Sequence, residues 1–239
     1  MGRVSAPPDR ADGSEARLAL AETAPFGFGM FPLGVAFGLL VVQSGLAWWW
    51  APLFSGLIYA GSLEFLLVGM LLVATPLASI ALTTFLVNSR HVFYALSFPL
   101  HRVRGRLARV YAMFALIDEA YALTATRPPE SLSSRRILCT QVLLQSYWVT
   151  GGIVGALAGQ WLPGPIDGLS FALTSLFVVL AIDACRSGQD LSDPALAVGC
   201  ALVAATVAPG QMLVVAMGLY VLGLLARYRV TLDREAARA

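Results

Sequence analysis

The chain contains no lysine, only two histidines and three cysteines, and charged residues make up 13% of its 239 positions. All 16 basic residues are therefore arginines, and they do not gather into the concentrated basic face that nucleic-acid binding needs. Cys139, Cys185 and Cys200 are scattered through apolar runs, so they predict neither a disulfide framework nor a CxxC site. With so few histidines beside them, the sequence predicts no metal site and no cofactor.

Long stretches of the chain also lack charge altogether. Residues 23–63, 137–166 and 194–226 contain no Asp, Glu, Arg, Lys or His. A run of about 20 apolar residues spans a bilayer, and in lipid the backbone is satisfied by helices. The short alternating segments of a transmembrane barrel are absent, as are the HExxH and GxSxG motifs of enzymes. The sequence therefore predicts an all-α, polytopic membrane bundle that is not an enzyme.

Turn signals divide the apolar part of the chain into about seven transmembrane segments. The polar stretch 1–22 is expected to be a tail, 23–228 the transmembrane domain, and 229–239 a second tail. The predicted segments, of which the third is expected to be broken near 88–91, run near 25–46, 49–73, 76–100, 137–162, 169–185, 194–209 and 211–227.

The distribution of arginine predicts how the chain is oriented. The loop 101–136 holds seven arginines against three acidic residues, and the tripeptide RYR occupies 227–229. Because cytoplasmic loops carry an excess of basic residues, this loop and the C-terminus are expected in the cytoplasm. Three full crossings before residue 101 then place the N-terminus outside, which is the arrangement we favour from the sequence. A re-entrant hairpin at 76–100 instead places it inside.

Two features of these segments allow alternative interpretations. Gly34 and Gly38 favour either close helix packing or a kinked helix that lines a cavity, whereas the glycines at 151, 155 and 159 favour packing. The apolar stripe at 110–123 lies beside Asp118 and Glu119. It predicts either an interfacial helix with solvated acids or an element that gates or handles protons.

Near the end of the fifth segment, Asp183 and Arg186 are expected to form a pair at the membrane boundary, solvated by headgroups. A role in coupling is the alternative for this pair.

Charged residues stand inside two of the apolar segments. Glu64 lies in the second, and Arg90 and His91 lie in the third. Each charge at a helix centre costs roughly 2.5–3.5 kcal/mol, so each needs a partner or water. If the two segments form an antiparallel hairpin, a rise of about 1.5 Å per residue offsets Glu64 and Arg90 by roughly 7–8 Å, and their side chains converge. The sequence thus predicts a buried Glu64–Arg90 pair, either part of a transport pathway or a device that fixes helix register.

Hydrogen-bonding neighbours accompany both charges. Ser62 precedes Glu64, and Asn88 precedes Arg90. Residues of this kind tolerate an unwound turn, and discontinuous transporter helices bind substrate at such turns. Tyr94 follows Arg90 by four positions and shares its helix face.

The order of three motifs, YAGSLEF at 59–65, NSRHVFYALS at 88–97 and DEAYAL at 118–123, resembles the large subunit of AzlC-type branched-chain amino acid exporters. The resemblance extends from about residue 24 to 227. It implies proton-driven export of a branched-chain amino acid across the bacterial inner membrane, with a small membrane subunit of the AzlD type. The chain departs from the family pattern at Glu64, where Gln is frequent.

A zwitterionic substrate needs a cation for its carboxylate and an anion for its ammonium group. The guanidinium of Arg90 suits a carboxylate, which it binds bidentately, and Glu64 with Ser62 suits the ammonium. Burial moves the pKa of a carboxyl or an imidazole toward neutrality, which suits proton coupling. The predicted site comprises Arg90, Glu64, Asn88, Tyr94 and Ser62 for substrate, Glu64 and His91 for coupling, and Asp118 and Glu119 for gating.

Two other classes of protein fit the same sequence. A membrane scaffold or sensor that binds a cytoplasmic partner through the loop 101–136 predicts no solute flux. A channel predicts conductance that does not depend on a proton gradient.

Overall fold

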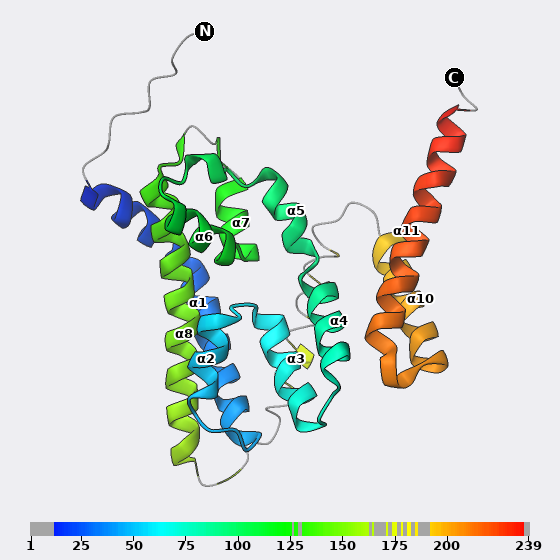
Figure 1. Ribbon diagram of the computed structural model, residues 1–239, viewed down its shortest axis with the longest axis horizontal. Helices are drawn as coiled ribbons and strands as arrows, with labels where there is room; N and C mark the ends of the chain where they lie inside the picture. The colour runs from blue at the N-terminus through cyan, green and yellow to red at the C-terminus, as the bar shows by residue number, and fades with distance from the viewer. Residues whose placement is uncertain are drawn as a thin grey trace. The chain divides into compact units, whose positions relative to one another are not determined.

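The computed structural model describes residues 12–125, 127–128, 131–162 and 192–236, together with Gly164 and isolated positions between 171 and 185 (Figure 1). Within these residues the chain forms helices and no strand, which confirms the all-α prediction. The chain divides into two compact units, residues 1–75 with 87–170, and residues 76–86 with 171–239. Most of the predicted fifth segment, including Asp183, and Arg186 beyond it, lies outside the described residues.

Two helices in the described part are long and apolar enough to cross a membrane. Helix α1 (Asp12–Gln43) has 32 residues and α8 (Ser134–Trp161) has 28. At 1.5 Å per residue they measure about 48 and about 42 Å, more than the roughly 30 Å of a bilayer core. They correspond to the first and fourth predicted segments. Because α1 begins at Asp12, residues 12–22 of the predicted tail belong to a helix.

The second and third predicted segments are each divided into two helices. The second consists of α2 (Trp50–Leu57) and α3 (Gly61–Leu72), and between them Tyr59 adopts a φ of 48°. The third consists of α4 (Leu77–Asn88) and α5 (Arg90–Ser97), which are separated by Ser89, within the stretch 88–91 where a break is expected. The two breaks differ, because the intervening Ser89 keeps helical dihedrals of −55° and −29°.

The Arg-rich loop is folded rather than extended. It contains the short 3₁₀ turn η1 (Leu100–Arg102), α6 (Arg106–Phe114) and α7 (Asp118–Ala125), so the expected stripe at 110–123 is divided between two helices. A cluster of buried apolar side chains holds α6 against the start of α8. Its members are Phe98, Val103, Ala112, Leu116, Leu132 and Ile137.

Glycines bring α1 and α8 into backbone contact. A Cβ atom on Gly38 would lie 2.1 Å from the carbonyl oxygen of Gly152, and one on Gly155 would lie 2.0 Å from that of Val35. No side chain fits at such distances, so only glycine permits this approach. Both glycine-rich segments therefore serve close helix packing.

The helices α1 and α8 run parallel, side by side (Figure 1). Toward their amino-terminal halves, the hydroxyls of Thr23 and Tyr147 lie 3.4 Å apart. Toward their carboxyl ends, a Cβ on Gly159 would lie 3.4 Å from the Cβ of Val42. Contacts thus advance along both helices in the same direction.

The second unit contains α10 (Ser192–Val207), the 3₁₀ turn η3 (Pro209–Gln211) and α11 (Met212–Ala236). An ion pair joins Asp193 to Arg227, and Leu196 packs against Gly223, so α10 and α11 form an antiparallel pair. These helices correspond to the sixth and seventh predicted segments, while the number of membrane crossings stays a prediction.

Candidate functional site

Four of the predicted site residues gather between α5 and α7. The Nη1 atom of Arg90 lies 2.8 Å from Oδ2 of Asp118, with the two side chains 44% and 39% exposed. The Nε2 atom of His91 lies 3.9 Å from the other oxygen, Oδ1. Asp118 is therefore ion-paired at the start of α7, where the amino-terminal end of the helix dipole also favours a negative charge.

Aromatic rings line one side of this pair. The ring of Tyr94 stacks on Tyr121 with centroids 4.3 Å apart, and His91 lies 5.6 Å from Tyr94. The hydroxyls of Ser97 and Tyr121 are 2.9 Å apart, within hydrogen-bonding distance. Tyr94 thus shares the face of Arg90, as its spacing predicts, and its ring holds α5 against α7.

The predicted ion pair between Glu64 and Arg90 is wrong. Glu64 is fully buried, and its Oε1 accepts a hydrogen bond of 2.9 Å from the backbone N–H of Ala60. The indole Nε1 of Trp148 donates to the same carboxylate, 3.0 Å from Oε2. The prediction assumed two continuous antiparallel helices, whereas the second segment is interrupted between α2 and α3, where Tyr59 adopts a φ of 48°.

Trp148, which donates to the Glu64 carboxylate, belongs to a group of three packed aromatic rings. Phe37 stacks on Trp148 with centroids 6.1 Å apart and meets Phe65 edge-on at 5.4 Å. A carboxylate at the start of a helix is favourable, and this one satisfies a backbone N–H that precedes α3. Glu64 therefore fixes where α3 begins.

Tyr59 and Glu119 are two further partly or fully buried polar residues near these groups. Tyr59 is only 3% exposed, its hydroxyl has no hydrogen-bond partner among the described residues, and the charges of Glu119 and Glu64 both act on it. Burial raises the pKa of the Glu119 carboxyl above its ordinary value, and the charge of Asp118 acts in the same direction. Glu119 is half-buried in the first turn of α7.

The other predicted residues lie outside the ion-paired cluster. Ser62 is in the first turn of α3 and Asn88 is the last residue of α4; both are half-buried. Neither forms part of the contacts around Asp118.

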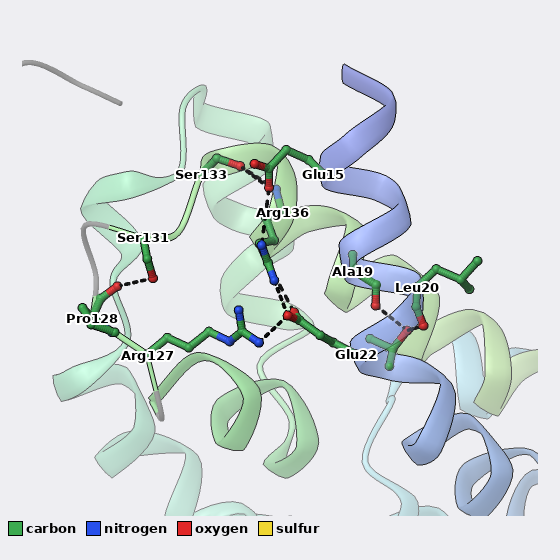
Figure 2. Close-up of polar contacts among 10 residues, drawn as sticks. Glu15, Ala19, Leu20, Glu22, Arg127, Pro128, Ser131, Ser133 and Arg136 are labelled. Atoms are coloured by element: carbon green, nitrogen blue, oxygen red, sulfur yellow. Dashed lines mark hydrogen bonds and ion pairs between the residues drawn. The ribbon is translucent and has the colours of Figure 1, made fainter. Parts of the chain in front are cut away.

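A second ionic network, which the sequence analysis missed, joins α1 to α8 (Figure 2). The buried Arg136 binds Glu22 bidentately, with Nε 3.2 Å from Oε2 and Nη2 bonded to Oε1. Arg127 donates to the same Oε1 from the segment that follows α7. Glu22 therefore holds two parts of the Arg-rich loop against α1.

Glu15 completes this network about two helical turns earlier on α1. Its carboxylate accepts a hydrogen bond from Ser133, and Nη1 of Arg136 lies 4.0 Å away (Figure 2). Ser133 in turn caps α8 by accepting from the backbone N–H of Arg136 at 3.1 Å. The spacing of seven residues between Glu15 and Glu22, which puts both on one helix face, was the available signal.

Comparison with known proteins places the geometry in a family context. The family model described as AzlC protein matches residues 25–162. The branched-chain amino acid transport protein AzlC of Bacillus subtilis is 28% identical over 91% of this chain and 87% of its own length. No solved structure matches the chain.

Two further relatives are membrane proteins. A membrane protein of Haemophilus influenzae is 30% identical over 79% of this chain and 78% of its own length. The inner membrane protein YgaZ of Escherichia coli is 28% identical over 74% of this chain and 76% of its own length.

Proposed function

This chain belongs to the AzlC protein family, and from that premise we propose that it transports a branched-chain amino acid across the membrane. The name of the Bacillus subtilis relative supports this substrate class, and the related membrane proteins agree with a membrane location. The contact that carries the proposal is the ion pair between Arg90 and Asp118.

A free amino acid carries its carboxylate and its ammonium on one carbon atom. In the proposed site Arg90 binds the carboxylate and Asp118 binds the ammonium. The two substrate groups thus take the place of the Arg90–Asp118 ion pair. The partial exposure of both side chains, 44% and 39%, leaves them open to such an exchange.

The ammonium role thereby moves from Glu64 to Asp118. The carboxylate of Glu64 already accepts hydrogen bonds from Ala60 and Trp148, and removing a buried acceptor from its donors is expensive. Asp118 instead lies directly beside Arg90. Glu64 fixes the start of α3 in this proposal.

The proposal includes export, coupling to protons and a small AzlD-type subunit, in line with the family resemblance. His91 is the coupling residue of choice, since it lies 3.9 Å from Oδ1 of Asp118 and an imidazole titrates near neutral pH. Protonation of His91 places a second positive charge near Asp118 and so weakens the Arg90–Asp118 pair that the substrate must open. Export by a His91→Gln variant should then lose its dependence on the proton gradient.

Efflux of labelled leucine from cells, with and without a coexpressed small subunit, tests the function. Arg90→Gln and Asp118→Asn should each lower efflux about tenfold or more, the loss expected for one charge-assisted hydrogen bond. The Arg227–Asp193 pair is a matched control, because its side chains are 47% and 50% exposed. Arg227→Gln and Asp193→Asn should leave efflux unchanged.

Normal efflux by Arg90→Gln and Asp118→Asn at normal membrane levels rules out this site. Absence of leucine, isoleucine and valine flux in the unmodified chain, with and without the small subunit, rules out the function itself.

A further inference from the structure

We infer that residues 44–75 form a re-entrant segment, which enters the membrane and leaves it on the same side. The start of α1 then lies on the same side of the membrane as the Arg-rich loop 101–136. This topology is independent of the proposed substrate.

The parallel packing of α1 and α8 carries the first step. The network of Glu22 with Arg136 lies near the start of both helices, and Gly159 packs on Val42 near their other ends. Because the Arg-rich loop leads directly into α8, the start of α1 lies on the side of that loop. The basic loop marks this side as the cytoplasm.

A second step follows from counting crossings. Helix α1 ends on the far side of the membrane, and the chain must be back on the cytoplasmic side at the loop. Two apolar segments, 49–73 and 76–100, lie between these points. If both crossed, the chain would arrive on the wrong side, so one of them crosses and the other does not.

The depth of the first break identifies the segment that does not cross. A Cβ on Gly61, which follows the break, would lie 3.2 Å from the ring of Trp148, midway along α8. Helices α2 and α3 have 8 and 12 residues. At 1.5 Å per residue they reach about 12 and about 18 Å, each short of the roughly 30 Å core.

The direction of α3 agrees with a re-entrant segment. Phe65 on α3 meets Phe37, which lies farther along α1 than Gly34, the residue packed against the backbone of Trp148. Figure 1 shows α3 running back toward the end from which α2 starts. The left-handed φ of 48° at Tyr59 makes this turn possible, and the residue is buried, as irregular backbone at membrane depth must be.

The second break lacks these features, which leaves 76–100 as the crossing segment. Ser89 keeps helical dihedrals, and the N–H of Val92 donates to its carbonyl at 3.1 Å. We therefore infer that α1 starts on the cytoplasmic side, whereas the sequence favoured an N-terminus outside. The re-entrant segment is 49–73 and not 76–100.

Labelling of single cysteines in the full-length chain tests this topology, after Cys139, Cys185 and Cys200 are replaced by Ser. The reporter variants are Gly13→Cys, Ala47→Cys, Val73→Cys and Arg104→Cys, all at exposed positions. A membrane-impermeant maleimide applied to intact cells should label the variants at 47 and 73. Inverted vesicles should expose the variants at 13 and 104, and denatured chain should label at all four positions.

Labelling of positions 13 and 104 from opposite sides would contradict the inference that the start of α1 and the Arg-rich loop lie on the same side of the membrane. Labelling of 47 and 73 from opposite sides overturns the re-entrant segment. The parallel packing of α1 and α8 can be tested separately by cross-linking, which does not depend on the side of the membrane. A short bifunctional thiol reagent should join Gly27→Cys to Tyr147→Cys but not Gly27→Cys to Trp161→Cys. Linkage of the second pair alone contradicts parallel packing.

Discussion

Two arginines of this protein hold acidic partners in opposite ways. Arg136 is buried, 7% exposed in its side chain, and binds Glu22 bidentately with Glu15 close by. Arg90 is 44% exposed and reaches Asp118 through one nitrogen. Both pairs consist of a guanidinium and a carboxylate, so the difference lies in solvent and in the number of bonds.

This difference separates an anchor from an exchangeable contact. A buried, fully paired charge cannot lose its partner without exposing the other charge to an apolar interior, whereas a half-exposed pair is worth only about 0–1 kcal/mol. The network around Arg136 therefore holds α1 and α8 in place, and the pair at Arg90 is free to exchange partners with a ligand.

The largest effect is expected from breaking the anchor. Arg136→Ala removes the buried member of this pair and leaves Glu22, whose side chain is 20% exposed, beside a single remaining arginine. Breaking a buried pair by removing one partner costs roughly 3–5 kcal/mol. In thermal unfolding of the purified protein in detergent, the unfolding temperature should fall strongly for this variant and only slightly for Arg90→Ala. Equal losses in the two variants would contradict the division into anchor and exchangeable pair.

A somewhat smaller effect is expected where the same helices touch through glycine. In Gly38→Ala the new methyl group meets the carbonyl oxygen of Gly152 at 2.1 Å, so the helices must separate. Overpacking of this kind costs about 1–3 kcal/mol. Gly29→Ala on the same helix is the control, because its Cβ meets nothing within 4 Å. Similar unfolding temperatures for the two variants would argue against a tight α1–α8 contact.

The smallest effect concerns Glu119, which lies beside the exchangeable pair. Burial raises the pKa of the Glu119 carboxyl, so the folded protein favours its neutral form. The stability that the neutral form contributes is present below the ordinary pKa of 4.5 and is lost as the pH rises above it. The unmodified protein should therefore lose more stability than Glu119→Gln between about pH 5 and about pH 8. Unfolding measured at both pH values checks the sign, and a larger loss in the variant would refute it.

The sequence predicts the parts of this structure that depend on local pattern. The apolar runs locate α1 and α8, the glycine spacing identifies their packing, and the polar run at 88–91 marks the break before α5. What it misses depends on distant partners. From the sequence, Glu22 is assigned to a polar tail because its partly buried partner network includes Arg136, which lies 114 residues away.

The error at Glu64 has a different origin. The sequence shows that a buried carboxylate needs a partner, and the nearest cation in the adjacent segment is Arg90. The actual donor is the indole of Trp148, a neutral group on a helix 84 residues later, and no charge pattern points to it. Depth arithmetic along two helices fails because the break at Tyr59 changes the direction of the chain.

The separation between Glu22 and Arg136 also has a consequence in time. At a synthesis rate of about 5–20 residues per second, the 114 residues between them take roughly 6–23 s to make. Throughout that interval α1 is already synthesised, while the arginine that will neutralise its acidic face does not yet exist. The first helix therefore enters the membrane with its ionic partners missing, and its final hold on the protein is a late event of biosynthesis.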